Sequence, residues 1–195
     1  NRLVHGDVHK SMPKYRFWGN AVLTLMTKIA SGYWHVTDAQ TGFTACTKEV
    51  LANLPFEKLY TDYGYPNHLL VMLNIWNFRV KDIPSKPIYG VGEISHIRVR
   101  RVAIKISWLL YTSFWWRMRE KYIIRDFHPL IFFYTGGFLS TIIGFLLSIR
   151  LIILWNTMGR IPPINALAVM FFTLMGLQFL LFAMWFDMEA NKHLK

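Results

Sequence analysis

Asp38 and Gln40 are the two residues of this chain whose types and spacing best suit chemistry on a bound molecule. They follow an apolar run at 33–36 and precede Gly42, which permits the backbone to reverse because it has no side chain. If the apolar run is a strand, the carboxylate and the amide lie at its end or at the mouth of a cleft. Because α/β proteins usually place their chemistry there, this pair is our candidate catalytic centre.

A plainer interpretation of the same stretch is a surface turn. In that case Thr41 or Thr44 would be the N-cap of the next helix, its hydroxyl accepting a hydrogen bond from an exposed backbone amide. Taken alone, the pattern favours this turn over a catalytic centre. The argument for chemistry therefore depends on what surrounds Asp38.

Basic side chains precede the candidate centre. Residues 1–14 are polar, lack periodicity and carry several cations. Guanidinium groups offer forked donors that suit phosphate, so Arg2 and Arg16 favour an anion-binding flap, whereas the alternative is a solvated segment. Apolar spacing then predicts a helix over 18–29 that Gly32 ends.

The elements that follow must position this centre, and we expect them to form a mixed layer. Short and apolar helices are predicted over 47–54 and 68–77. Residues 78–83 alternate in polarity and predict a strand whose exit is marked by prolines. The order of helix, strand, helix, helix and strand predicts half of an α/β layer, too short for a complete doubly wound domain.

The segment 97–122 has a different character, because basic residues interleave with Trp, Leu and Ile. Its cations are Arg98, Arg100, Arg101, Lys105, Arg117, Arg119 and Lys121. A helix with a basic side and an aromatic side suits a membrane interface, where anionic headgroups attract the cations. Basic residues with aromatics could also stack on bases. We prefer the membrane to nucleic acid because this segment leads directly into an uncharged apolar stretch.

Two long apolar runs follow, in keeping with a hydrophobic content of 53%. Each run reaches the roughly 20 residues that a helix needs to cross a bilayer core of about 30 Å. We therefore predict two transmembrane helices, over about 129–155 and 164–186. Gly136, Gly137 and Gly144 are expected to let the two helices approach closely.

Charge predicts the side of the membrane. Eight Lys or Arg lie between Arg98 and Arg125, against Arg160 alone in the predicted turn between the spans. Positive residues are retained on the cytoplasmic side, so we expect the soluble part and the C-terminus to be cytoplasmic. The single cysteine, Cys46, excludes an internal disulfide framework and fits that compartment.

Several short motifs occur along the chain in a fixed order. They are Asn1-Arg2-Leu3, Met12-Pro13-Lys14-Tyr15-Arg16 with Gly19-Asn20, Asp38-Ala39-Gln40-Thr41-Gly42-Phe43, Tyr63-Gly64, and Tyr89-Gly90-Val91-Gly92-Glu93-Ile94-Ser95. With this set the chain resembles membrane-associated family 2 glycosyltransferases that act on polyprenyl phosphates, such as the dolichyl-phosphate mannose and glucose synthases. The motif at 38–43 is moderately specific alone, and the ordered set is considerably more so.

The resemblance implies that residues 1–96 are the acceptor-side half of a Rossmann-like GT-A catalytic domain. In that family the preceding half carries the nucleotide-binding strands and an Asp-x-Asp motif for Mg or Mn. Neither is present here, so we expect the metal motif upstream of Asn1 and no metal ligand in this chain. Interface helices would then occupy 97–128, the two spans 129–186, and a cytoplasmic tail 187–195.

The resemblance also implies roles for individual side chains. Asp38 and Gln40 would lie at the sugar and the acceptor. The residues that would hold phosphate groups of the acceptor or donor are Arg2, Lys14, Arg16, Asn20, Ser95 and Arg98. Two departures from the family pattern are the Asn20 side chain, where Ser is common, and the His96–Arg98 region, where many relatives have a Lys.

Together these features predict a membrane-bound enzyme that transfers a sugar from a nucleotide sugar to a polyprenyl phosphate with inversion. Because the lipid phosphate is already an anionic nucleophile, alignment and charge balance matter more than a strong base. Asp38 is then either a base or an orienting group. The alternative is a non-catalytic, membrane-anchored scaffold or assembly subunit, and glycines in the spans leave a homo-oligomer open.

Overall fold

The computed structural model describes residues 14–39, 42–84 and 99–195. The chain forms two compact units. Residues 1–124 together with 191–195 make up the N-terminal unit, and residues 125–190 make up the hairpin unit. Both are helical, and the described residues contain no strand.

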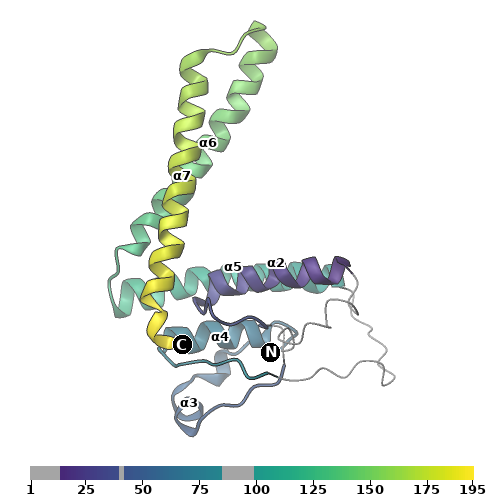
Figure 1. The fold of residues 1–195 in the computed structure, drawn as a ribbon, viewed down its shortest axis with the longest axis vertical. Helices are drawn as coiled ribbons and strands as arrows, with labels where there is room; N and C mark the ends of the chain where they lie inside the picture. The colour runs from purple at the N-terminus through teal and green to yellow at the C-terminus, as the bar shows by residue number, and fades with distance from the viewer. Residues whose placement is uncertain (1–13, 40–41, 85–98) are drawn as a thin grey trace. The chain divides into compact units, whose positions relative to one another are not determined.

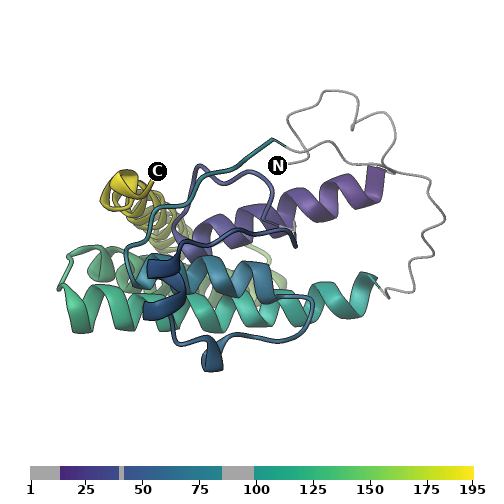
Figure 2. The ribbon, with the colours of Figure 1, turned by 90° about the horizontal axis from the view of Figure 1, so that it is seen from below.

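Three helices build most of the N-terminal unit. They are α2 (Lys14–Ser31), α4 (Tyr65–Ile75) and α5 (Val99–Arg119). Helices α2 and α5 run side by side, and α4 packs against both of them (Figure 1). Seen from below, α4 lies in front of α5 and runs along it (Figure 2). The chain continues from α5 into a π-helical segment, Glu120–Arg125.

Helix α2 confirms the helix predicted over 18–29 and extends it to Lys14. It ends where the sequence predicts, because Gly32 has φ +76° and its amide donates to the Lys28 carbonyl at 2.8 Å. This left-handed backbone is open to glycine at little cost. A Cβ on Gly32 would also collide with the guanidinium of the fully buried Arg117.

The predicted short helix over 47–54 is confirmed as α3 (Lys48–Asn53), but its cap differs from the prediction. Thr47 is the N-cap, and its hydroxyl accepts from the Val50 amide at 3.4 Å. The assignment of Thr44 as cap is therefore wrong, and Thr41 lies outside the described residues. Thr47 stands directly before the first helical residue, which is the position a cap must have.

Helix α4 confirms the apolar helix predicted over 68–77, with earlier limits at both ends. Pro66 lies in its first turn, where the missing amide hydrogen has no intrahelical acceptor to lose. Asn77, just beyond the C-cap, adopts a left-handed φ of 58°. Nine of the eleven residues of α4 are buried, so this helix forms the centre of the N-terminal unit.

The α/β layer predicted from the sequence is not observed in the described residues, and the strand predicted over 78–83 is wrong. That segment lies outside helix and strand, as does the apolar run 33–36, which contains a turn. A ladder needs backbone amides paired along two segments. Here the Val80 amide donates instead to the carbonyl of Leu194 at 3.2 Å, near the C-terminus.

The C-terminal residues belong to the core of the N-terminal unit. Leu194 is 1% exposed and packs in one cluster with Tyr33, Val36, Met72 and other apolar side chains. Residues 191–195 therefore fold with the N-terminal unit and do not form a separate tail.

A buried polar cluster lies beside this core. The Lys121 ammonium donates to the Asn74 carbonyl and to Asn74 Oδ1, both at 3.0 Å, and to Asn191 Oδ1 at 2.8 Å. The Asn191 amide in turn donates to the Tyr122 hydroxyl at 2.8 Å. A buried charge is tolerated when several oxygen atoms surround it, so this cluster ties α4, the π-helical segment and the C-terminal residues together.

The hairpin unit consists of α6 (Leu130–Met158) and α7 (Pro163–Ala190), which pack against each other. Both predicted spans are confirmed as helices and are longer than expected. In the most apolar stretch of each helix, only 11% of the residues are buried within the protein. Both helices are long and apolar enough to cross a bilayer, and their exposed apolar surface indicates association with a membrane.

The predicted close approach of the two helices is confirmed. A Cβ on Gly137 would lie 3.1 Å from the Leu180 amide nitrogen, and one on Gly144 would lie 3.1 Å from that of Thr173. On the facing helix, a Cβ on Gly176 would lie 2.8 Å from the Thr141 amide nitrogen. Small residues at the contact let the two backbones come together, as packing between membrane helices requires.

Candidate functional site

A cavity of about 500 Å³ opens in the N-terminal unit next to Asp38. Three parts of the chain line it: residues within 36–50, residues of α4 between Pro66 and Leu73, and the segment 78–83. Its inner wall is apolar and includes the buried residues Val36, Val50 and Leu69. Its volume falls in the range of small-molecule sites in proteins.

Charged side chains line the same cavity. Asp38, Glu49 and Asp82 are acidic, and Arg79 and Lys81 are basic. Asp38 is 9% exposed, whereas Glu49, Arg79 and Lys81 are exposed. The cavity therefore combines an apolar wall with cations that could bind an anionic group and a buried carboxylate that could orient a polar one.

Contacts at alternate positions hold two walls of the cavity together. Thr37 donates to Asp82 Oδ2 from its amide at 2.9 Å and from its hydroxyl at 2.8 Å. His35 Nε2 lies 2.7 Å from the Val80 carbonyl oxygen, and the Tyr33 hydroxyl donates to the Phe78 carbonyl. These links join Tyr33, His35 and Thr37 to Phe78, Val80 and Asp82, so they fix the segment 78–82 beside the turn that precedes Asp38.

Tyr33, which makes the first of these three links, is fully buried. Burial raises the pKa of the Tyr33 phenol far above its usual value, and the nearby Arg117 guanidinium opposes that rise only in part. The phenol therefore stays protonated at neutral pH and remains a hydrogen-bond donor. Its role is to fix the chain just before Asp38.

The structure brings one of the predicted site residues, Asp38, to the cavity. Gln40, Arg2, Ser95 and Arg98 lie outside the described residues, so their predicted roles stay predictions.

The remaining predicted site residues lie on α2. Lys14 and Arg16 occupy its first turn, and Asn20, which is partly exposed, follows in the second. At a rise of 1.5 Å per residue, Asn20 is about 17 Å along the helix axis from Ser31, where the chain leaves α2 toward the cavity.

Sequence reasoning missed the basic and acidic residues of the segment 78–83. Arg79 and Lys81 line the cavity, and Asp82 is hydrogen-bonded to Thr37. The available signal was the alternation of these charged residues with Phe78 and Val80. That alternation predicts a strand, whereas the segment forms a wall of the cavity.

Within the described residues, no three His, Cys, Asp or Glu side chains gather closely enough to hold a metal ion. The Mg or Mn expected from the resemblance is thus assigned to no residue of the cavity. Comparisons with protein-family models, with curated proteins and with solved structures gave no match to this chain.

Proposed function

We propose that this chain is the acceptor-side part of a membrane-bound glycosyltransferase that moves a sugar from a nucleotide sugar to a polyprenyl phosphate with inversion. The observation that carries the proposal is the position of Asp38. It is a largely buried carboxylate on a cavity that also has an apolar wall and the cations Arg79 and Lys81. The ordered motifs of the sequence, from Arg2 to Ser95, supply the resemblance on which the reaction class rests.

In the proposed reaction a phosphate oxygen of the lipid attacks the anomeric carbon of the sugar. A new carbon–oxygen bond forms there, the bond from that carbon to the nucleoside diphosphate breaks, and the diphosphate leaves with the electron pair. The nucleophile is already an anion, so Asp38 would orient the sugar or the acceptor, or accept the proton of an acceptor phosphate that is still protonated. Cations beside the phosphates would offset their negative charge. Mg or Mn would help the diphosphate to leave, and we expect the residues that hold this metal to lie outside the cavity.

The membrane association of the hairpin unit supports a lipid-linked acceptor. A polyprenyl phosphate presents its phosphate at the headgroup plane, and α6 and α7 are apolar enough to anchor the enzyme at that plane. The excess of Lys and Arg over 98–125 relative to the turn at Arg160 supports a cytoplasmic site. Nucleotide sugar would then reach the site from the cytoplasm.

An assay with the full-length protein tests this proposal. The protein is incubated in lipid vesicles with labelled nucleotide sugars, polyprenyl phosphate and a divalent metal, and the glycolipid is extracted. Asp38→Asn should lower transfer by about 100-fold or more, since a positioned acid or base contributes roughly that factor. Glu49→Gln removes another carboxylate of the same cavity, an exposed one, and should leave transfer within about twofold, as expected for removal of a weak exposed charge interaction.

Two outcomes would count against the proposal. Equal activity of Asp38→Asn and the unaltered protein would remove Asp38 from the reaction. Absence of glycolipid with every common donor would favour the alternative, a membrane-anchored scaffold without catalysis.

A further inference from the structure

An apolar surface runs across the two long helices of the N-terminal unit, away from the cavity segments. Helix α5 exposes four large side chains at spacings of four, three and four residues: Ile104, Trp108, Tyr111 and Trp115. Such spacing places all four on one narrow stripe of the helix. Trp108 is 67% exposed, and its ring stacks on Tyr111 at 5.5 Å between centroids.

Helix α2 carries a matching stripe. Trp18, Val22 and Leu25 are spaced by four and three residues and are 67%, 55% and 50% exposed. The sequence places no charge among these three positions. A helix that only packed on its own unit would be expected to turn polar side chains toward water here.

Contacts with α4 show which side of α2 this stripe occupies. Thr27 Oγ1 forms a hydrogen bond with Asn67 of α4 at 3.1 Å. Thr27 is nine residues after Trp18, and at 100° per residue nine residues amount to half a turn beyond two full turns. The stripe of α2 therefore points away from α4.

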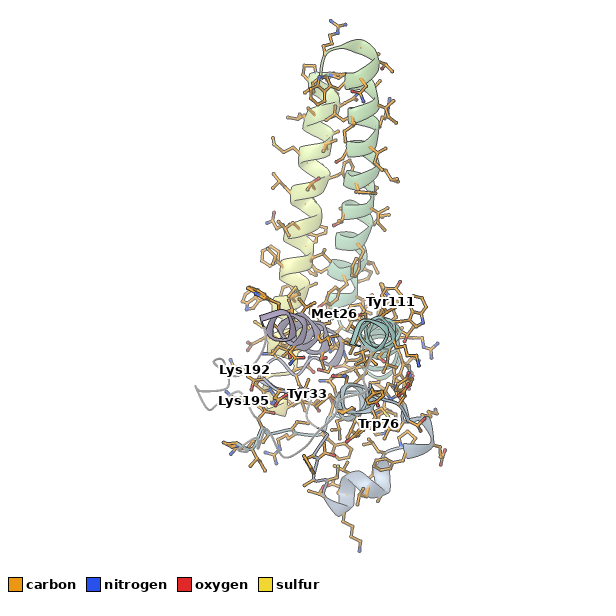
Figure 3. All side chains as sticks on the ribbon, turned by 90° about the vertical axis from the view of Figure 1, so that its right-hand side faces the viewer. Met26, Tyr33, Trp76, Tyr111, Lys192 and Lys195 are labelled. Atoms are coloured by element: carbon orange, nitrogen blue, oxygen red, sulfur yellow. The ribbon has the colours of Figure 1, made fainter. Side chains whose placement is uncertain are left out.

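The stripe of α5 points the same way. Trp116 stacks on His68 of α4 at 5.6 Å between ring centroids, and Trp116 lies about a third of a turn from the stripe. Figure 3 shows α2 and α5 side by side and nearly end-on, with Tyr111 on one side of the pair and Trp76, next to the end of α4, on the other. At the seam between the helices, Met26 Sδ lies 3.8 Å from Ser107 Oγ. The two stripes thus form one surface, which we call the aromatic platform.

The size of the aromatic platform sets it apart from ordinary exposed apolar residues. Trp18 and Trp108 are both two-thirds exposed, and at about 250 Å² for a whole side chain they alone present on the order of 300 Å². Five further apolar side chains extend the surface past the range of about 300–600 Å² for the largest patch of a typical soluble monomer. A surface of this kind is normally covered.

We infer that the aromatic platform lies on the surface of the same bilayer that the hairpin unit enters, so that α2 as well as α5 is a membrane-contacting helix. Only about ten residues separate the end of α5 from the start of α6, so the platform cannot leave the neighbourhood of the bilayer. Trp and Tyr favour the headgroup region because one end of each ring system is apolar and the other polar. The exposed Arg119, one turn beyond Trp115 on α5, adds a cation suited to anionic headgroups.

This inference goes beyond the proposed activity and does not depend on sugar transfer. The sequence indicated an interface role for the segment 97–122 alone. The exposed stripe of α2, the helix that follows the predicted phosphate-binding flap, extends that role to a second helix of the N-terminal unit.

Spin labels on the full-length chain in vesicles test the platform directly. In a Cys46→Ser background, single cysteines replace Val22, Ile104 and, as matched control, Leu51. Val22 and Leu51 are aliphatic and almost equally exposed, at 55% and 56%, but Leu51 lies on α3. The vesicles contain phosphatidylcholine with a minority of phosphatidylglycerol, and each label is probed with oxygen and with a water-soluble nickel chelate.

We expect the labels at Val22 and Ile104 to have an oxygen-to-nickel accessibility ratio several-fold above that of the label at Leu51. A ratio at Val22 equal to that at Leu51, with Ile104 in lipid, would confine the membrane contact to α5 and overturn the inference. Protection of Val22 and Ile104 from both reagents would show that protein, such as a second copy of the chain, covers the surface, and would overturn it too. Because no substrate is present, neither result bears on the transfer assay.

Discussion

Lys121 and Asn191 meet in the interior of the N-terminal unit, where the ammonium of Lys121 donates to Asn191 Oδ1 at 2.8 Å. Seventy positions and both apolar helices separate these two residues along the chain. The contact means that the chain returns from the hairpin unit to complete the unit in which it started. The C-terminal residues therefore contribute to the stability of the unit that holds the cavity.

Removing the Asn191 amide should destabilise the N-terminal unit. In Asn191→Ala the buried Lys121 ammonium loses an acceptor and the Tyr122 hydroxyl loses a donor. Hydrogen bonds to charged groups contribute about 1.5–3 kcal/mol, so the free energy of unfolding should fall by about that amount. Thermal unfolding in detergent micelles measures the change. His193→Ala, an exposed neighbour, is the control, and equal midpoints for the two variants would contradict the prediction.

Alanine at Gly19, inside α2, and alanine at Gly32, directly after α2, should change the stability of the N-terminal unit in opposite directions. Gly32→Ala forces a left-handed residue and places its Cβ against Arg117 and 3.1 Å from Asn74 Nδ2. The backbone strain alone costs about 1–2 kcal/mol. Gly19 lies within the helix with open space around it, so Gly19→Ala should stabilise by about 0.5–1 kcal/mol. Unfolding midpoints of both variants check the signs, and a stabilising Gly32→Ala would show that the turn is formed differently.

Acid should weaken the N-terminal unit through His68. Burial lowers the pKa of His68 below its usual 6.5, and Nδ1 accepts a hydrogen bond from the Tyr60 amide at 3.3 Å. The unfolded chain then binds a proton as pH falls through 6.5 while the folded chain resists it. Stability is complete above that pH and is lost on the way down to the folded-state pKa.

The variant His68→Gln isolates this effect. Its unfolding midpoint should be less sensitive to pH between neutrality and mild acid than that of the unaltered protein. Parallel pH profiles for the two proteins would assign the acid sensitivity to other groups.

The cavity should open when Asp82 loses its carboxylate. Asp82→Ala removes both hydrogen bonds from Thr37, which contribute about 1–2 kcal/mol together. Such a change raises the population of an opened state about fivefold to thirtyfold. Cys46 lines the cavity, so its rate of reaction with a thiol reagent reports the opening. Asp62→Ala, which removes an exposed ion pair with Lys105, should leave that rate nearly unchanged.

A larger side chain at Gly176 should push the two apolar helices apart. The Cβ of Gly176→Val would lie 2.5 Å from Thr141 Oγ1 and 2.8 Å from its amide nitrogen. Overpacking of this kind costs about 1–3 kcal/mol. Spin labels at the exposed positions Phe145 and Leu174 would then report a longer and broader distance distribution. Leu177→Val, on the exposed side, should leave the distribution as it is.

Local patterns in the sequence determined most of the helices of this protein. The apolar spacing of α2, the two long uncharged runs, and the glycines at their contact are properties of neighbouring residues, and each has the structural result expected of it. Helix periodicity, the length of an apolar run and the need of a left-handed turn for glycine are all properties of a single continuous stretch of sequence. The immediate neighbours of Asp38, by contrast, favour a surface turn, and only the wider sequence makes Asp38 a candidate.

Tertiary structure alone decided what the segment 78–83 does and where the C-terminal residues lie. Alternating polarity fits a strand, but it does not distinguish a strand from the wall of a cavity, and all six residues of 78–83 line the cavity. Which one forms depends on the partner of the backbone amides, and the amide of Val80 is bound by Leu194, 114 positions later. The common direction of the exposed stripes of α2 and α5 depends in the same way on contacts with α4, which no local pattern contains.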